Sequence, residues 1–281
     1  MKQESPTPFF FAGELIAGSQ LIRPLRVREL SECWLAFHRR NRIPIAIKFL
    51  RPEHPRIPQF YEMAEFLKTA PSPFLIRVFD CGETVSGLPY ATMEYADGGT
   101  LRRQLTGHRR LPLATAVRLL REMLRGLAAL HAHDMVHRDV KPDNIWLTSD
   151  GDFRLGDFGL VQLPGYPEER GKIFGTASCM SPEQAHDSTS VDARSDLYSL
   201  AVVLFEVLTG DRLRPKGSFA ETLKFILSDR SAPPVDRLKV VATENLALLL
   251  GRMLEYSPAL RPRSATEILA ELDAMSLPGG V

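Results

Sequence analysis

The chain has 281 residues, of which 44% are apolar and 25% are charged, an ordinary mixture for one large globular domain or two smaller lobes. Its net charge of +1 gives no general attraction to nucleic acid or to an anionic membrane, so neither is expected as a partner. The three cysteines, Cys33, Cys81 and Cys179, are far apart and form no Cys-x-x-Cys pair, which argues against a disulfide framework or a zinc site and favours the reducing cytoplasm.

The first twenty residues are predicted to be an irregular N-terminal extension with two prolines. The stretch "FFFAGELIAG" is short and is interrupted by Glu14, so it does not have the pattern of a signal peptide. The longest apolar stretch, residues 197–210, is too short to span a bilayer and is predicted to be a buried helix.

Residues 21–95 carry mostly strand signals. The apolar runs 33–38 and 43–50 are joined by the polar turn "RRNR", a pattern typical of a hairpin. Helical spacing of apolar residues follows over 58–70, and residues 74–83 and 89–96 return to strand patterns.

From about residue 97 onward the chain is predicted to be helical. Apolar residues form one stripe in a helix around 113–133, and further helices are expected over 196–209, 244–255 and 264–274. The last of these opens with the capping box Ser264-x-x-Glu267. The predicted fold is therefore α+β with two lobes, a small β-rich one with one helix and a larger, mostly helical one.

Four segments carry the chemistry, and their order is "IAIK" (45–48), "VHRDVKPDNIWL" (136–147), "LGDFGL" (155–160) and "GTASCMSPEQA" (175–185). Phosphoryl transfer mainly needs positioning and neutralisation of charge. Asp139 suits the proton of an acceptor hydroxyl, and Lys141 suits the moving phosphoryl group. Asn144 and Asp157 offer the hard oxygen ligands that Mg²⁺ prefers. Lys48 supplies a fixed positive charge for the phosphates that are not transferred.

In this order the motifs closely resemble those of the eukaryotic-type protein kinases, and "MSPEQA" is most similar to the bacterial Ser/Thr branch. The resemblance covers residues 21–275, with an N-lobe at 21–95, a C-lobe at 96–275 and a tail at 276–281. It implies a bilobal protein-kinase fold that transfers the γ-phosphoryl of ATP, with Mg²⁺, to serine or threonine hydroxyls of a protein substrate. The protein substrate and any signalling partner are not specified by the motifs.

The resemblance also implies roles for individual residues. Lys48 is expected to pair with a helix glutamate, and Glu62 is favoured over Glu65, although the spacing from "PFL" at 73–75 points to Met63. Thr176 resembles the threonine that bonds the catalytic aspartate and lysine. The expected adenine-binding set is Leu25, Cys33, Ala46, Met93 as the gatekeeper, Glu94 and Ala96 at the hinge, and Trp146.

Further expectations concern bracing and regulation. Asp196 resembles the buried aspartate that braces the catalytic loop, and Glu183 with Arg261 resembles a buried ion pair. Arg138 precedes the catalytic aspartate, where the family commonly uses an arginine to meet a phosphate. No Ser or Thr lies between residues 160 and 174. Glu168 or Glu169 is a candidate fixed negative charge in place of that phosphate, with plain exposed loop acids as the alternative.

The stretch "LRVRELSEC" (25–33) occupies the place of the phosphate-binding loop and contains no glycine. Arg26, Arg28 and Ser31 stand where the resemblance implies glycine. If these residues adopt the positive φ that glycine allows, each costs about 1 kcal/mol or more and nucleotide binding is weakened. An arginine here either adds positive charge for the triphosphate or points into solvent.

Three functions follow from these features. The first is an active Ser/Thr protein kinase, because Lys48, Asp139, Lys141, Asn144 and Asp157 are all present. The second is a pseudokinase or scaffold that binds ATP weakly or not at all, supported by the glycine-free loop. The third is a small-molecule phosphotransferase of the same fold, which the segment "SPE" at 181–183 argues against.

Overall fold

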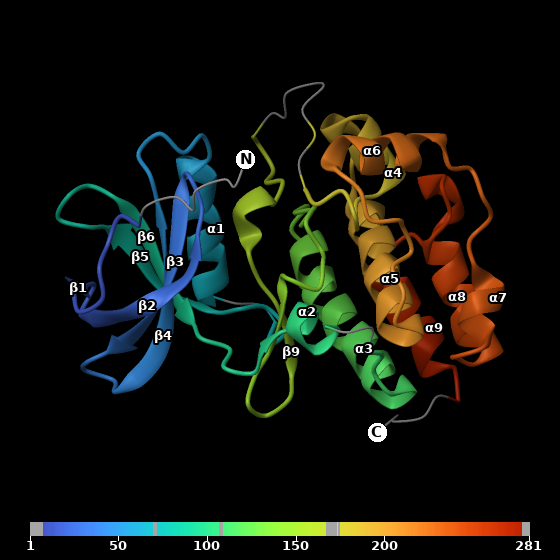
Figure 1. The fold of residues 1–281 in the computed structure, drawn as a ribbon, viewed down its shortest axis with the longest axis horizontal. Coiled ribbons are helices and arrows are strands. Elements are labelled where there is room, and N and C mark those ends of the chain that lie inside the picture. The colour runs from blue at the N-terminus through green and yellow to red at the C-terminus, as the bar shows by residue number, and fades with distance from the viewer. Residues whose placement is uncertain (1–7, 70–71, 107–108, 167–172, 174, 277–281) are drawn as a thin grey trace. The chain divides into compact units, whose positions relative to one another are not determined.

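The computed structural model describes residues 8–69, 72–106, 109–166, 173 and 175–276. The chain forms two compact units, Met1–Asp97 and Gly98–Val281. The expected α+β class is confirmed, with a curled sheet in the first unit and mainly helices in the second (Figure 1). In the described part of the chain, no helix has the length and apolar character needed to cross a membrane.

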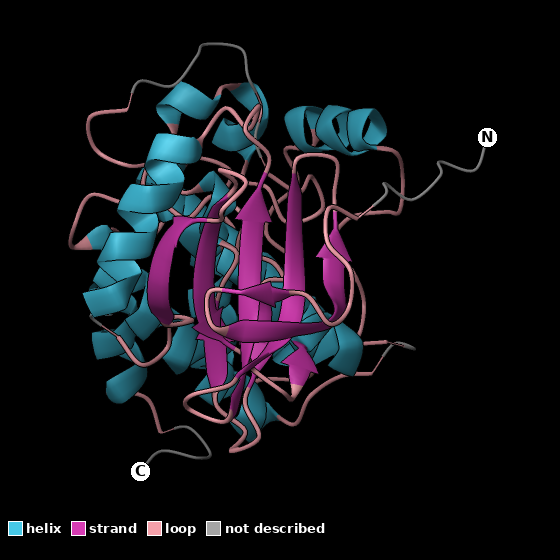
Figure 2. Cartoon of the chain, turned by 90° about the vertical axis from the view of Figure 1, so that its left-hand side faces the viewer, coloured by secondary structure: helices cyan, strands magenta, loops and turns pink. Residues whose placement is uncertain are grey.

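The first unit is built on an antiparallel sheet with strand order β1-β2-β3-β4-β6-β5 (Figure 2). Its elements are β1 (Leu15–Ile16), β2 (Ser19–Val27), β3 (Ser31–His38), β4 (Ile43–Leu50), α1 (Ile57–Thr69), β5 (Val78–Glu83) and β6 (Pro89–Glu94). The hairpin expected from residues 33–38 and 43–50 is the β3–β4 pair, and the helix expected over 58–70 is α1.

Side-chain alternation divides this sheet into two faces. On one face, Trp34 and Phe49 are buried with their alternating neighbours in an apolar cluster. Lys48 lies on the other face, directly opposite Cys33 on β3 and Ala91 on β6. The face with Lys48 is called the lysine face below, and the face with Phe49 is called the apolar face.

Residues 8–20 of the expected N-terminal extension contain a strand and a packed aromatic residue, although the sequence predicted irregular structure. The expected boundary after residue 20 falls inside β2, and β1 precedes it. Phe10 is 6% exposed, and its ring lies 4.4 Å from that of Phe49 in the cluster on the apolar face. The two prolines had suggested an irregular extension, and the sequence has no periodic pattern there that indicates where Phe10 packs.

The second unit is mainly helical. Its helices are α2 (Leu101–Gln104), α3 (Leu113–His131), α4 (Pro182–His186), α5 (Ala193–Thr209), α6 (Phe219–Ser228), α7 (Val235–Lys239), α8 (Glu244–Met253) and α9 (Ala265–Asp273). A small sheet of β7 (Gly99–Thr100), β8 (Ile145–Leu147) and β9 (Phe153–Leu155) completes it. Helix α5 is apolar almost all round and packs against α3 and α8, as expected for a buried helix.

The cap of the last helix differs from its sequence signature in one bond. The Ser264 hydroxyl accepts the Glu267 N–H at 3.1 Å, as a capping box requires. The Glu267 carboxylate, however, accepts the N–H of Arg263 at 2.9 Å, one residue earlier than the box predicts. The helix therefore begins where expected with only half of the predicted reciprocal cap.

Candidate active site

Three side chains of the second unit form a closed hydrogen-bonded cluster. The Lys141 Nζ donates to Asp139 Oδ2 at 2.7 Å and to Thr176 Oγ1 at 2.5 Å. Thr176 Oγ1 in turn donates to Asp139 Oδ1 at 2.9 Å. The expected contact of Thr176 with the aspartate and the lysine is confirmed, and both oxygens of Asp139 are held in defined directions.

Asn144 orients the same carboxylate and leaves one oxygen of its own without a partner. Its Nδ2 donates to the Asp139 backbone oxygen at 2.9 Å and to Asp139 Oδ2 at 2.8 Å. The Asn144 Oδ1 is buried and accepts no hydrogen bond within the described part of the chain. A buried polar atom without a partner is costly, and an amide oxygen is a hard donor, so the site fits an oxygen-seeking divalent cation.

Asp157 is the second expected metal ligand, and its backbone conformation is unusual. Its φ is +57°, which is the left-handed region that a non-glycine residue rarely adopts. The 3₁₀ turn Phe158–Leu160 follows it directly. Backbone strain of this kind persists only where surrounding structure holds it, and it is concentrated at functional positions.

The buried carboxylate of Asp196 holds the backbone just before Asp139, the candidate catalytic aspartate. Asp196 is 0% exposed, and its oxygens accept the N–H groups of His137 and Arg138, both at 2.8 Å. It also contacts His131 Nε2 at 2.9 Å. Arg138 has a φ of +64°, so these two bonds fix a strained turn immediately before Asp139. The bracing role expected for Asp196 is confirmed.

His137 has a structural role in this loop. It is completely buried, and burial lowers its pKa. Its two ring nitrogens have different partners, since Nδ1 accepts the Asp139 N–H at 3.3 Å and Nε2 lies 3.2 Å from the Gly156 oxygen. A neutral imidazole with its proton on Nε2 satisfies both bonds. Because both ring nitrogens of His137 are then occupied by backbone groups, Asp139 and not His137 is the candidate acceptor for the substrate proton.

A glycine and a glutamine hold the segment that carries Thr176. Gly175 has a φ of +120°, and a Cβ at this position would lie 2.9 Å from the Arg138 oxygen. The same oxygen accepts a hydrogen bond from Gln184 Nε2 at 2.8 Å. Any larger residue at position 175 would therefore disturb the contact between this segment and the catalytic loop.

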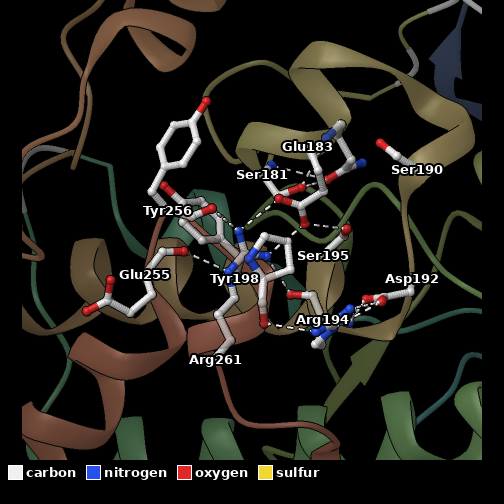
Figure 3. A network of polar contacts seen from close by, with 12 residues as sticks. Ser181, Glu183, Ser190, Asp192, Arg194, Ser195, Tyr198, Glu255, Tyr256 and Arg261 are labelled. Carbon is white, nitrogen blue, oxygen red and sulfur yellow. Dashed lines mark hydrogen bonds and ion pairs between the residues drawn. The ribbon is translucent and has the colours of Figure 1, made fainter.

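A buried ion pair joins the start of α4 to the segment just before α9 (Figure 3). Arg261 and Glu183 form two parallel bonds of 2.7 and 2.8 Å, and the Arg261 side chain is 0% exposed. Burial alone would raise the pKa of Glu183, but the bonds from Arg261 and from Ser195 hold that pKa below its usual range. The expected pair is confirmed, and its fork geometry is the one that arginine makes best.

Arg214 also supports the segment after Thr176, and the sequence motifs did not identify it. It is 5% exposed and lies between α5 and α6. Its guanidinium donates to the backbone oxygens of Ala177 and Ser178, at 3.0 and 3.3 Å, and to the Tyr198 hydroxyl at 2.9 Å. Cys179 is next in this segment, and burial raises the pKa of its thiol to about 11, so the thiolate is scarce.

In the first unit, the sheet brings several expected nucleotide-binding residues onto the lysine face. Lys48 and Cys33 are direct partners across β3 and β4, and Ala46 is the direct partner of Met93. Arg26 on β2 is the partner of Cys33, so Leu25, the residue before Arg26, lies next to the Cys33–Lys48 pair along the sheet. In the second unit, the expected base-covering Trp146 lies on β8, half-buried, as the partner of Arg154 on β9.

The expected partner of Lys48 is not placed by a contact. Glu62 is exposed on α1, whereas its neighbour Met63 is 3% exposed. Glu65, the alternative, is also exposed and is bonded to Lys68 at 3.1 Å and to Cys81 Sγ at 3.2 Å. The pairing of Lys48 with Glu62 therefore stays a prediction. The expected hinge residues Glu94 and Ala96 lie at the end of β6 and just beyond it.

The glycine-free stretch is a short hairpin rather than a strained loop. Residues 28–30 join β2 to β3, and the Arg28 N–H donates to the Ser31 oxygen at 2.8 Å. None of residues 25–33 has a positive φ. The expectation that missing glycines impose backbone strain here is therefore wrong, because this tight turn never requires the conformation that glycine provides.

Comparisons with known proteins agree with this geometry. The protein kinase domain family matches residues 29–272. The chain belongs to the protein kinase family.

Its relatives include the serine/threonine-protein kinases PknB of Mycobacterium leprae, 33% identical over 253 residues, and PknB of Mycolicibacterium smegmatis, 35% identical over 256. PknL of Mycobacterium tuberculosis is 39% identical over 204 residues. The matches cover 86%, 86% and 72% of this chain. They cover 40%, 40% and 50% of the three relatives, so the chain corresponds to about half or less of their length.

Some features of this kinase domain lie outside the family match or outside the described residues. The packed aromatic residues Phe9 and Phe10 and the whole of β2 precede residue 29. The candidate acidic residues Glu168 and Glu169 lie outside the described residues.

Proposed function

We propose that this kinase domain transfers the γ-phosphoryl group of ATP to serine or threonine hydroxyls of a protein. The cluster of Asp139, Lys141 and Thr176 supports this function most directly. Its three bonds fix an aspartate and a lysine side by side, which is the arrangement that accepts a proton and neutralises charge during phosphoryl transfer.

Each residue has a defined part in the reaction. Asp139 accepts the proton of the acceptor hydroxyl while the hydroxyl oxygen bonds to the γ-phosphorus. The bond between the γ-phosphorus and the β–γ bridging oxygen breaks, and ADP leaves. Lys141 neutralises the transferring group, and Lys48 holds the non-transferred phosphates. Asn144 and Asp157 would hold Mg²⁺, which supplies charge neutralisation at the phosphate oxygens.

The acceptor class follows from the cluster itself. Lys141 and Thr176 form the arrangement that the resemblance assigns to Ser/Thr kinases. The curated relatives above carry the name serine/threonine-protein kinase. The expected base-binding set of Leu25, Cys33, Ala46, Met93, Glu94, Ala96 and Trp146 belongs to the same proposal. So does a cytoplasmic location, where ATP is available and the three cysteines stay reduced.

The test is phosphotransfer by the wild-type chain and by Asp139→Asn. We expect Mg²⁺-ATP-dependent autophosphorylation, or transfer to a generic basic protein, to fall by about 10²–10⁴-fold in Asp139→Asn, the usual contribution of a general base. Phosphoamino-acid analysis should show phosphoserine or phosphothreonine. Equal background signal from both proteins would contradict the proposal.

A scaffold that binds ATP weakly is the second candidate, because the hairpin at 28–30 lacks the glycines of the resemblance, although its backbone shows no positive φ. Thermal shift with Mg²⁺-ATP separates the two, because a ligand that binds the folded state raises the melting temperature. No shift together with no transfer would support the scaffold. A small-molecule acceptor panel tests the remaining possibility, which the bonded Glu183–Arg261 pair of the protein-substrate type argues against.

A further inference from the structure

The N-terminal segment packs on the apolar face of the first unit's sheet. Phe10 is buried in the cluster with Trp34 and Phe49, and Phe9 packs at its edge. The Phe9 N–H donates to Glu32 Oε1, and the second oxygen of Glu32 accepts the Trp34 indole N–H at 2.7 Å. Glu32 is 1% exposed, so a buried carboxylate on β3 fixes the position of Phe9.

Arg51 joins this segment to the tip of the glycine-free hairpin. Its guanidinium carbon lies 3.9 Å from the centre of the Phe9 ring, in the position for a cation–π contact. The Arg51 Nε donates to the Glu29 backbone oxygen at 3.0 Å. Its backbone N–H donates to the Leu30 oxygen, also at 3.0 Å. Arg51 thus holds two successive carbonyl groups of a connection only three residues long.

These contacts determine which way the hairpin presents its amide groups. The Arg51 guanidinium lies over the ring of Phe9, and Phe9 packs against the cluster on the apolar face, so the Arg51 side chain lies on that side of the sheet. A trans peptide is planar, and its C=O and N–H point in opposite directions. With the Glu29 oxygen bonded to Arg51 on the apolar face, the Leu30 N–H of the same peptide points toward the lysine face.

The Leu30 N–H is available to a ligand. Among the described residues it has no hydrogen-bond acceptor. This N–H points toward the side of the sheet that carries Lys48, so it can donate a hydrogen bond to a phosphate oxygen. Backbone N–H groups of a glycine-rich loop usually donate such bonds. The carbonyl bonds from Arg51 achieve this orientation without a positive φ at any residue of the hairpin.

We propose that Arg51, held in place by Phe9, is a positioning residue that orients the glycine-free hairpin of residues 28–30, called the phosphate hairpin below, toward the ATP phosphates. This inference rests on the proposed function, because it assigns the hairpin a phosphate ligand. It adds a residue outside the motifs quoted above and a segment that precedes the family match. Neither residue is expected to touch the nucleotide.

The experiment compares ATP with adenosine, which has the same base and sugar but no phosphates. Dissociation constants of both ligands are measured for the wild type, Arg51→Ala and Phe9→Leu, with Mg²⁺ present. Loss of one hydrogen bond is worth about 1 kcal/mol, so we expect ATP binding to Arg51→Ala to weaken by about fivefold. Adenosine binding should stay unchanged. Phe9→Leu keeps an apolar side chain but removes the cation–π contact, and should weaken ATP binding by about twofold.

The matched control is Arg40→Ala, which removes an exposed arginine from the turn at the other end of the β3–β4 hairpin. It should leave both dissociation constants unchanged. The double variant Phe9→Leu with Arg51→Ala should bind ATP as weakly as Arg51→Ala alone, because Phe9 acts through Arg51. In steady-state assays, KM for ATP should rise in Arg51→Ala while kcat is retained.

Three results would overturn the inference. The first is an equal rise in the dissociation constants of ATP and adenosine in Arg51→Ala, which indicates general damage to the unit. The second is no change in either dissociation constant. The third is a wild type that binds no ATP. Failure of the proposed function has a different signature. A wild type that binds ATP more tightly than Arg51→Ala, yet transfers no phosphate, would refute kinase activity and leave the role of Arg51 standing.

Discussion

The catalytic loop in the second unit and the phosphate hairpin in the first are held by different kinds of contact. Around Asp139, completely buried side chains such as Asp196 fix a strained backbone. At residues 28–30 no residue has a positive φ, and Arg51 donates hydrogen bonds to the backbone oxygens of Glu29 and Leu30. The loop that carries the proposed catalytic residues is therefore fixed by buried contacts, whereas the hairpin is held in part by an exposed one.

This difference indicates where substitutions should have large effects. Removing one partner of a buried charged pair leaves the other charge uncompensated, at a cost of several kcal/mol. Exposed or half-exposed contacts are worth about 1 kcal/mol or less, because water replaces them. The largest effects are therefore expected at the buried contacts of the second unit, and the smallest at positions of the first unit where no contact is buried.

Glu183→Gln should have the largest effect on stability. It leaves the buried Arg261 without its counter-charge, and we expect the free energy of unfolding to fall by about 3 kcal/mol. Chemical denaturation measures this loss. The matched control is Glu244→Gln, whose exposed pair with Lys239 should contribute less than about 1 kcal/mol. Equal effects of the two variants would break the comparison.

The same pair predicts a pH dependence. Because the pKa of Glu183 in the folded protein lies below its ordinary value of 4.5, the ionised pair stabilises the fold above that value. This stability is lost as the pH falls through the lowered pKa of the folded state. Unfolding measured from pH 6 downward should show a component that disappears in Glu183→Gln. A wild type and variant with parallel curves would contradict this assignment.

Thr176→Val should reduce catalysis more than stability. It removes the hydroxyl that bridges Lys141 and Asp139, and hydrogen bonds to charged groups are worth about 1.5–3 kcal/mol. We expect kcat to fall by roughly ten- to a hundredfold. Thr176→Ser keeps the hydroxyl and should retain most of the activity. A serine variant as impaired as the valine variant would show that the methyl group, not the hydroxyl, is required.

Gly175→Ala tests whether the positive φ of this residue and its close approach to the catalytic loop require glycine. The alanine Cβ would meet the Arg138 oxygen at 2.9 Å with φ at +120°, so kcat should fall by about tenfold, as a strain of 1–3 kcal/mol predicts.

Ser31→Gly should have the smallest effect on binding, because no residue of the hairpin has a positive φ. ATP affinity measured by calorimetry should change by less than about twofold, with a loss of stability of about 0.5–1 kcal/mol from greater chain entropy. A large gain in ATP affinity would show that the missing glycines do impair this loop. Ser178→Gly, outside the hairpin, is the control for the general effect of a serine-to-glycine change.

The sequence predicted the residues whose chemical type and spacing the reaction itself requires. Asp139, Lys141 and Asn144 lie within six residues of one another, so their proximity follows from local geometry once the family pattern is seen. The pair Glu183–Arg261 spans 78 positions and was predicted only because the resemblance supplied it.

Contacts made by tertiary packing alone were not predictable. Arg214 and Arg51 resemble any other surface arginine in the sequence, and only the fold shows that each binds backbone carbonyl groups. Helical spacing marked the apolar face of α1, and Met63 on that face is buried. It could not decide between Glu62 and Glu65 as the partner of Lys48, because both are exposed and the spacing of apolar residues says nothing about which of them pairs.

The ring of Phe10 has a practical consequence for how this domain is delimited. A shortened protein that began at residue 21 or 29, as the motifs or the family match would suggest, would uncover the ring of Phe49 and leave the carboxylate of Glu32 without the amide of Phe9. Such a fragment would expose an apolar aromatic surface, so we expect it to aggregate more readily than the longer chain. We therefore expect the stable folding unit to include Phe9 and Phe10, which precede the residue at which the family match begins.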